Sequence, residues 1–272
     1  MCMEQISSVR KEVGAHPMPY YREIRNECAI FREAYRAGLS VMLKGPTGCG
    51  KTRFVQYMAA QLNRPLITVS CHDDTSATDL LGRFVVSGGD TLWQDGPLTS
   101  AVRESAIIYL DEVAEAREDV VVVIHPLTDH RRALYIDKTG EHLVADEQFM
   151  LVVSFNPGYQ RRVKELKPST RQRFVGLGFN YPSPEVEAEI ISAESGVSLK
   201  VAERLTDIGA RLRQLEELGL AETVSTRLLI HAGVLMKAGL DPRYACQAAI
   251  AQPLTDDLDV ERSINDLVAL IF

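Results

Sequence analysis

The chain has 272 residues, which allows one large domain or a core with a smaller partner domain. Hydrophobic residues make up 46% and charged residues 25%, an ordinary globular composition that excludes a disordered, collagen-like or coiled-coil protein. The net charge of −7, from 30 basic and 37 acidic residues, would repel a phosphate backbone and argues against nucleic acid as a partner.

The lengths of the apolar runs and the positions of the cysteines exclude further classes of protein. No run approaches the roughly 18 apolar residues of a membrane helix, so we expect a protein that is not membrane-embedded. Residues 1–11 lack the apolar segment of a secretion signal, which predicts a cytoplasmic location. The cysteines are scattered and form no C-x-x-C pair, so we expect reduced thiols and neither a disulfide framework nor a zinc site.

Short apolar runs separated by helix-length segments predict a parallel α/β sheet. These runs are residues 39–43, 66–69, 106–110 and 150–155. The densest apolar run, residues 120–124, also suits a buried strand. Two segments interrupt the alternation, residues 84–93 and residues 133–144, each with a turn-forming stretch at its centre, and both predict inserted hairpins.

Beyond the Tyr-Pro-Ser-Pro segment at residues 181–184 no strand-like run remains. Apolar residues recur there at steps of three and four, which is typical of amphipathic helices. These residues are Val201, Leu205, Ile208, Leu212, Leu215 and Leu218, and then Leu258, Ile264, Leu267, Val268 and Ile271. We therefore place a boundary near Pro182, with an α/β core and its N-terminal extension in residues 1–182 and a small helical domain in residues 183–272.

A glycine-rich stretch after the first predicted strand matches the phosphate-binding pattern G-x-x-x-x-G-K-[ST], and a predicted helix follows it. The stretch comprises Gly45, Pro46, Thr47, Gly48, Cys49, Gly50, Lys51 and Thr52. Glycines let backbone N–H groups approach phosphate oxygens, and the helix N-terminus adds unsatisfied donors. Lys51 should reach the β- and γ-phosphates of ATP, and the Thr52 hydroxyl is suited to Mg²⁺. A glycine-rich turn without a ligand is the alternative.

Two further strand ends carry polar residues suited to ATP hydrolysis. Asp111 and Glu112 follow one apolar run, and Asp111 would hold Mg²⁺. Because side chains alternate along a strand, Glu112 should point away from Asp111 and would act as general base. Asn156 follows the run at 150–155, and its amide would contact the attacking water or the γ-phosphate. The plainer interpretations are a solvated acidic strand end and an Asn-Pro turn.

Other reactive side chains receive mostly structural interpretations. Residues 71–74, Cys-His-Asp-Asp, lie adjacent on an extended chain and no second cluster completes a metal shell, so we expect a polar junction between strand and helix. His125 follows five apolar residues and is interpreted as a core or junction histidine. Cys49 lies among N–H groups and Lys51, which predicts a lowered pKa and a reactive thiol.

These motifs resemble AAA+ ATPases, specifically the MoxR branch and within it the CbbQ/NirQ/NorQ group, over nearly the whole chain. The strings similar to that group are residues 71–74 (CHDD), 93–99 (WQDGPLT), 125–129 (HPLTD), 156–160 (NPGYQ), 167–174 (KPSTRQRF) and 253–257 (PLTDD). The resemblance implies a P-loop AAA+ core with a parallel sheet and inserted hairpins, and a small C-terminal all-α lid domain. It also implies a ring, usually a hexamer, with nucleotide between neighbouring subunits.

The resemblance also implies roles for polar residues. Asn156 resembles sensor 1. Arg173 resembles the arginine finger that reaches the neighbour's nucleotide, with Arg171 as the rival, and a solvated basic turn is the alternative for either. Arg227 resembles sensor 2, which faces the nucleotide of its own subunit and reports loss of the γ-phosphate as a domain rotation. The two hairpins fit inserts near the pore face, with surface decoration as the alternative.

The client of such a motor follows only from the resemblance. Similarity to the CbbQ side implies a Rubisco activase that releases inhibitory sugar phosphates, together with a separate adaptor that carries a von Willebrand factor A-type domain. An activator of nitric oxide reductase and the ATPase subunit of a metal chelatase fit the same motifs. From other classes, a slow nucleotide-dependent scaffold and a small-molecule kinase are the alternatives. Glu112, Asn156 and Arg173 argue for hydrolysis, and the helical C-terminal part with Arg227 favours the AAA+ interpretation over a kinase.

Overall fold

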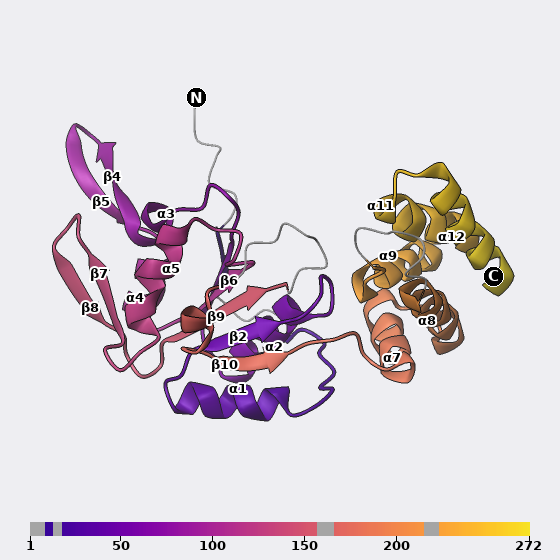
Figure 1. Cartoon of the computed structure of the whole chain (residues 1–272), viewed down its shortest axis with the longest axis horizontal. Helices are drawn as coiled ribbons and strands as arrows, with labels where there is room; N and C mark the ends of the chain where they lie inside the picture. The colour runs from indigo at the N-terminus through magenta and orange to yellow at the C-terminus, as the bar shows by residue number, and fades with distance from the viewer. Residues whose placement is uncertain (1–8, 13–17, 157–165, 215–222) are drawn as a thin grey trace.

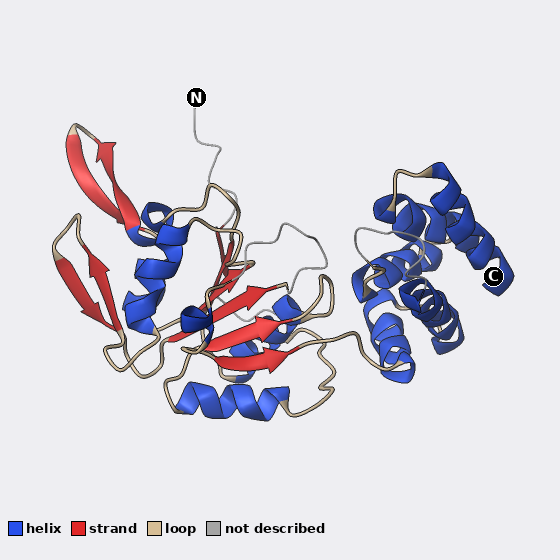
Figure 2. Ribbon diagram, in the orientation of Figure 1, coloured by secondary structure: helices blue, strands red, loops and turns tan. Residues whose placement is uncertain are grey.

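The computed structural model describes residues 9–12, 18–156, 166–214 and 223–272. A six-stranded sheet in the order β1-β3-β6-β9-β2-β10 lies at the centre of its N-terminal part (Figure 1 and Figure 2). Its strands are β1 (Val9–Glu12), β2 (Val41–Lys44), β3 (Leu66–Ser70), β6 (Ile107–Asp111), β9 (Met150–Phe155) and β10 (Val175–Gly178). β1 runs antiparallel to β3, whereas every other neighbouring pair is parallel, so the predicted parallel α/β fold is confirmed.

Helices cover both faces of the sheet because successive side chains along each strand point to opposite sides. Met42 and Ile108 belong to the core beneath α3, α4 and α5. Leu43 and Tyr109, their neighbours along the same strands, belong to the core beneath α1 and α2. The helices of this part are α1 (Glu27–Arg36), α2 (Lys51–Gln61), α3 (Ala77–Leu81), α4 (Pro97–Arg103), α5 (Glu118–Ile124), η1 (His125–Leu127) and α6 (Pro168–Arg171).

The densest apolar run of the sequence forms helix α5, so the prediction of a buried strand at residues 120–124 is wrong. Val120 and Ile124, one helical turn apart, are buried, whereas Val122 is 65% exposed. Burial at a spacing of four suits a helix that packs one side against the sheet. Glu118 in the first turn favours the helix N-terminus. Packing therefore overrides the preference of valine for strands.

Strand β10 has no counterpart among the predicted strands. Val175 and Leu177 alternate in it with Gly176 and Gly178, and glycine weakens a strand pattern because it has no side chain to pack. β10 pairs in parallel with β2 at the edge of the sheet. The residues that precede it, including α6, consequently lie near the amino ends of the strands.

Both predicted hairpins are confirmed. They consist of β4 (Gly82–Ser87) with β5 (Asp90–Asp95), and β7 (Ala133–Ile136) with β8 (Glu141–Val144). Figure 1 shows the two hairpins projecting side by side at the end of the molecule opposite the C-terminal helices. Trp93 is half-buried: its ring packs edge-on against Phe84 at 5.2 Å, and its indole N–H donates to Asp95 Oδ1 at 2.7 Å.

Residues from 184 onward form helices with a core of their own, which we call the helical region. The core includes Ile191, Leu205, Leu229 and Ile250. The elements are α7 (Pro184–Ser195), α8 (Leu199–Gln214), α9 (Thr226–Lys237), α10 (Pro242–Cys246), the π-helix η3 (Gln247–Ala251), α11 (Gln252–Leu254) and α12 (Leu258–Ile271). The predicted helical character is confirmed, although Leu215 and Leu218 lie outside the described residues. The exact boundary near Pro182 stays a prediction.

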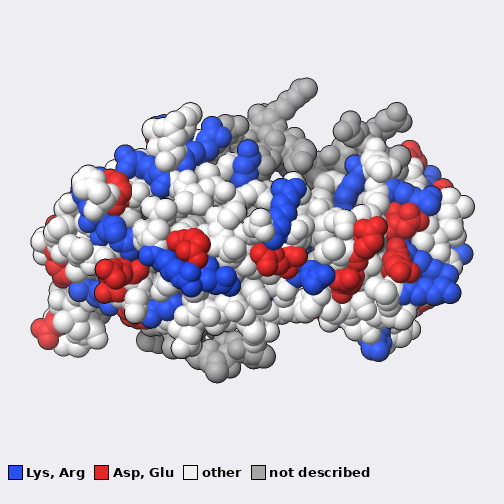
Figure 3. Space-filling model, turned by 90° about the horizontal axis from the view of Figure 1, so that it is seen from below, with Lys and Arg blue, Asp and Glu red and all other residues white. Residues whose placement is uncertain are grey.

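The described surface bears on two expectations. None of the helices in the described part of the chain combines the length and apolar character needed to cross a bilayer. On the face seen in Figure 3, Lys and Arg side chains are interspersed with Asp and Glu instead of gathering into one basic surface. The described residues of that face therefore offer no continuous basic surface to which a phosphate backbone could bind.

Candidate functional site

The predicted site residues meet at one edge of the sheet. Strands β6, β9 and β2 are adjacent and parallel, so their carboxyl ends lie side by side. The glycine-rich loop follows β2, Asp111 ends β6, and Asn156 follows β9. Ligands of open α/β sheets bind at this edge. The sheet order therefore brings together three motifs that are up to about a hundred residues apart in sequence.

Glycines shape the loop where a side chain would not fit. Gly48 has φ +68°, which side chains disfavour, and a Cβ there would lie 2.6 Å from Ser225 Cβ. A Cβ on Gly45 would lie 2.4 Å from the carbonyl oxygen of Phe179. Gly50 then caps helix α2, which starts at Lys51. The loop thus aims the unsatisfied N–H groups of α2 at the space above it.

The Lys51 ammonium group is held inside the loop. It donates to the carbonyl oxygens of Gly45 at 2.9 Å and Pro46 at 2.8 Å, and to Asn156 Oδ1 at 2.7 Å. Only 7% of the residue is exposed, and this burial lowers the pKa of Lys51. Phosphate oxygens would compensate the charge of this buried ammonium better than neutral carbonyl oxygens do.

Thr52 and Asp111 place hard oxygen donors next to each other. The Thr52 hydroxyl donates to Asp111 Oδ2 at 3.2 Å, and the Tyr109 hydroxyl donates to Asp111 Oδ1 at 2.7 Å. The Ser154 hydroxyl also donates to Asp111 Oδ1, so hydroxyls fix the carboxylate from several sides. A hydroxyl and a carboxylate are the ligand types that Mg²⁺ takes in nucleotide sites, and the pair fits that ion.

Glu112 faces the cavity because the chain turns sharply after β6. Its φ is +56°, a conformation rare outside glycine, and its N–H donates to Ser154 Oγ at 3.0 Å. This turn, and not the strand alternation that we expected, separates its side chain from that of Asp111. Glu112 Oε1 accepts from Asn156 Nδ2 at 3.0 Å. Burial, and then the charge of Asp111, raises the pKa of Glu112.

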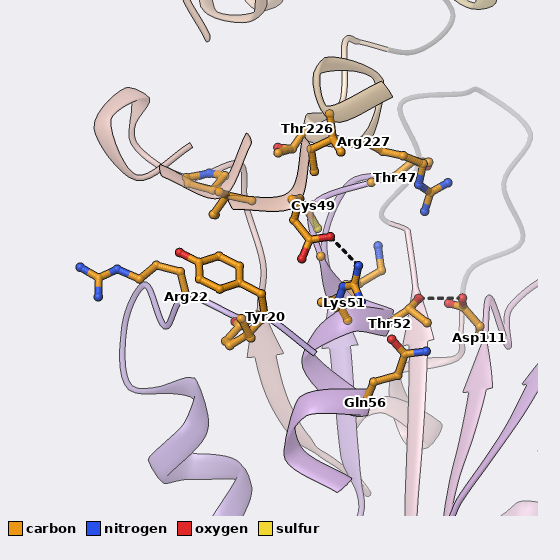
Figure 4. A pocket seen from close by; sticks show the side chains of 18 of the residues that line it. Tyr20, Arg22, Thr47, Cys49, Lys51, Thr52, Gln56, Asp111, Thr226 and Arg227 are labelled. Atoms are coloured by element: carbon orange, nitrogen blue, oxygen red, sulfur yellow. Dashed lines mark hydrogen bonds and ion pairs between the residues drawn. The ribbon is translucent and has the colours of Figure 1, made fainter. Parts of the chain in front are cut away.

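A cavity of about 500 Å³ lies between this edge of the sheet and the helical region. Figure 4 shows Thr226 and Arg227 on one side of the glycine-rich loop, residues 45–52, which we call the nucleotide loop from here on. Thr52 faces Asp111, and Tyr20 and Arg22 lie on another side of the loop. Arg227 lines this cavity, and its role toward a nucleotide stays a prediction. Further lining residues are Tyr21, Ile24, Gln56, Pro182, Ile190, Glu194, Ile230 and His231.

Arg171 and Arg173 do not line this cavity. They lie at the end of α6 and just before β10, near the opposite, amino-terminal edge of the strands. Arg173 Nη1 donates to Asp129 Oδ2 at 3.0 Å, and 35% of its side chain is exposed. Hydrogen bonds from Arg131 and Arg173 hold the pKa of Asp129 well below its usual range. The half-buried Arg171 is likewise engaged by contacts within the chain.

The remaining candidates resolve as follows. Burial raises the pKa of the Cys49 thiol, so the predicted lowered pKa is wrong and the thiol is not activated.

His125 contacts Thr170 through Nε2 and Oγ1 at 3.1 Å, as expected of a junction residue. The described residues contain no cluster of three or more His, Cys, Asp or Glu that could hold a metal. Ser76 caps α3 in a capping box with Asp79. Residues 157–160 of the Asn156 string lie outside the described residues.

Sequence reasoning missed several residues that the site depends on. Tyr109 lies two residues before Asp111 on the same strand, so both side chains share one face, and the sequence alone could have indicated this. Ser154 comes from a neighbouring strand, and only the register between β6 and β9 reveals it. Tyr20 and Arg22 precede the first helix and carry no motif.

Comparison with known families gives two matches. Residues 40–174 match the AAA domain of the dynein-related subfamily. Residues 187–271 match the CbbQ/NirQ/NorQ C-terminal domain. Together the two matches span the nucleotide loop, the sheet edge and the helical region.

Several relatives are similar over almost their whole length. The denitrification regulatory protein NirQ of Pseudomonas aeruginosa is 56% identical, over 93% of this chain and 97% of the relative. The protein NorQ of Paracoccus denitrificans is 54% identical, over 95% and 96%. The protein CbbQ of Hydrogenophilus thermoluteolus is 52% identical, over 97% and 99%.

A solved structure shares the fold. The crystal structure of a candidate ATPase from Cytophaga hutchinsonii aligns with a TM-score of 0.51, over 92% of this chain and 90% of the other. The identity of 17% limits this likeness to the fold.

Proposed function

The chain belongs to the CbbQ/NirQ/NorQ family of AAA domain ATPases, and from that premise we propose that it is a ring-forming motor that remodels a protein client. The observation that carries the proposal is the meeting of Lys51, the Thr52–Asp111 pair and the Glu112–Asn156 pair at one cavity edge. These are the parts that phosphoryl transfer to water requires.

The proposed roles follow from the chemistry of each group. Lys51 would bind the β- and γ-phosphates, and Thr52 with Asp111 would hold Mg²⁺, which neutralises phosphate charge when bound. Glu112 would orient and deprotonate the attacking water. Asn156 contacts both Lys51 and Glu112, so it would align the two with each other. Arg227 would contact the nucleotide of its own subunit.

A ring, most simply a hexamer, supplies what one subunit lacks. Arg173 lies near the edge of the sheet opposite the nucleotide loop and does not line the cavity, which supports the proposal that it reaches a neighbour's nucleotide. An ion pair with Asp129, with Arg173 Nη1 at 3.0 Å from Asp129 Oδ2, fixes the Arg173 side chain at the surface. An arginine supplied in this way stabilises charge that develops during hydrolysis.

Replacing Thr52 with Val should weaken ATP binding only when Mg²⁺ is present. The change removes the hydroxyl and keeps the shape, so we expect roughly tenfold weaker binding with Mg²⁺, the scale of a hydrogen bond to a charged group. Titration with a fluorescent ATP analogue, with Mg²⁺ or with EDTA, measures this. Thr52→Ser keeps the hydroxyl and should bind like wild type. Equal weakening of Thr52→Val in EDTA would contradict a magnesium role.

The acid limb of kcat/KM should lie above the pH expected for an ordinary glutamate, whose pKa is about 4.3. The base must be ionised, and burial with neighbouring charge raises the pKa of Glu112, so activity should fall at higher pH as the solution is acidified. Glu115 also raises this pKa. Glu115→Gln should therefore move the acid limb to lower pH, and an unmoved limb would contradict the assignment to Glu112.

The client is the finer part of the proposal. The resemblance to the CbbQ group supports Rubisco as the client. The motor would free Rubisco of inhibitory sugar phosphates with the help of a separate adaptor that carries a von Willebrand factor A-type domain. NirQ, the relative at 56% identity, is named a denitrification regulatory protein, and this favours nitric oxide reductase as the second candidate. A metal chelatase partner fits the same ATPase parts.

One experiment separates these clients. A Glu112→Gln chain loaded with ATP should stay in the client-bound state, so affinity capture from the source cell followed by mass spectrometry identifies what it holds. Rubisco subunits with an A-domain adaptor would support the activase. Nitric oxide reductase or chelatase subunits would reassign the client and leave the ATPase intact. Capture of the same proteins by a Lys51→Ala chain would contradict nucleotide-dependent engagement.

A further inference from the structure

Tyr181, at the junction between the sheet and the helical region, connects the two. Its hydroxyl donates to the carbonyl oxygen of Thr47, in the nucleotide loop, at 3.0 Å. The guanidinium of Arg213, at the end of α8, lies 4.0 Å from the centre of its ring. A cation this close to an aromatic face is attracted to it, so the Tyr181 ring joins loop and helix.

Arg213 is in turn tied to a buried carboxylate. Its two terminal nitrogens donate to Glu187 on α7 at 2.8 Å and 2.7 Å, in the paired geometry that suits guanidinium and carboxylate. Glu187 is 1% exposed. A buried charge keeps its partner, because an unpaired one would be costly. The ion pair therefore fixes the end of α8 against α7.

The same pair holds the start of α9. The Thr226 hydroxyl donates to Glu187, and Arg213 Nε donates to the Val224 carbonyl oxygen at 2.9 Å. Ser225, between these two residues, packs against Gly48 of the nucleotide loop. Arg227, the next residue of α9, lines the cavity. The residues on both sides of Ser225 are thus anchored to one ion pair.

We propose that Tyr181, Arg213 and Glu187 are positioning residues, which hold the start of α9, and with it Arg227, in register with the nucleotide loop. The proposal deepens the hydrolysis proposed above and rests on it. Tyr181 sets the loop against Arg213, and Arg213 with Glu187 sets α9. Because Arg227 lines the cavity and is the group proposed to contact the nucleotide, loosening this connection should affect the transition state more than ground-state binding.

The variant Tyr181→Phe tests the first contact, since it removes only the hydroxyl and keeps the ring beneath Arg213. We expect kcat for ATP to fall roughly three- to tenfold, the effect of one neutral hydrogen bond, with KM changed less than about twofold. Tyr35→Phe is the matched control: the Tyr35 hydroxyl donates to the Gln148 carbonyl oxygen at 3.1 Å, away from the cavity. It should leave both constants unchanged.

A second variant tests whether the contacts act as one unit. Arg213→Lys keeps the charge and loses the fork and the flat stacking surface, and it should also lower kcat. If the residues form one connection, the double variant should lose less than the product of the two single losses. Independent, multiplying losses would overturn the proposal, as would wild-type kcat in Tyr181→Phe, or a loss matched by Tyr35→Phe. Absent turnover in the wild-type chain would overturn the proposed hydrolysis itself, so the two failures are distinguishable.

Discussion

Glu112→Gln should lower ATP turnover by about 10²- to 10⁴-fold, the usual contribution of a general base, while ATP binding stays within about threefold. Glutamine keeps the shape and can still pair with the Asn156 amide, but it cannot take a proton from water. Lys51, Thr52 and Asp111, which would bind Mg·ATP, are unchanged. Phosphate release under saturating ATP and binding of a fluorescent analogue measure the two quantities separately.

Glu115 supplies the matched control for this change. It lies three residues further on and does not line the cavity, so Glu115→Gln should retain near wild-type turnover at neutral pH. Turnover of Glu112→Gln equal to wild type would reject Glu112 as the base. If the wild-type chain were as slow as Glu112→Gln, the chain would be the nucleotide-dependent scaffold considered from the sequence.

The sequence predicted those parts of the fold whose signal is local. Four strands of the parallel sheet and both hairpins follow from apolar runs and turn residues. The run at 120–124 misled because valine prefers strands, whereas its burial at a spacing of four arises only from packing on the sheet. Strand β10 was missed because its alternate residues are glycines, so that pairing with β2 defines it.

The candidate site divides in the same way. The nucleotide loop, Asp111 and Asn156 were predictable because each follows an apolar run directly. No motif reports the positive φ at which Glu112 turns, and Ser154 holds both Glu112 and Asp111 only because of the register between β6 and β9. The raised pKa of Cys49 depends on burial, which a loop sequence does not report. Motifs thus identified the chemical groups, and tertiary contacts determine their orientation and protonation.

Arg173→Ala should lower turnover by about 10³- to 10⁵-fold, the effect of losing an arginine finger. ATP binding should change little, because Arg173 does not line the cavity of its own subunit. Arg131→Ala is the matched control: Arg131 also pairs with Asp129, at 2.6 Å, so its loss tests whether the Asp129 pairing alone matters. A large loss in Arg171→Ala with little in Arg173→Ala would transfer the role to the rival arginine.

Mixing two inactive variants tests whether the arginine acts between subunits. A Glu112→Gln chain retains Arg173, and an Arg173→Ala chain retains Glu112. Where the first lies beside the second in a ring, it can supply the arginine to a cavity whose base is intact, so the mixture should recover activity that neither variant shows alone. An arginine that acted within its own subunit would give no recovery at any ratio. Recovery that rises with the mixed fraction would therefore establish a site shared between subunits, which the proposed ring requires.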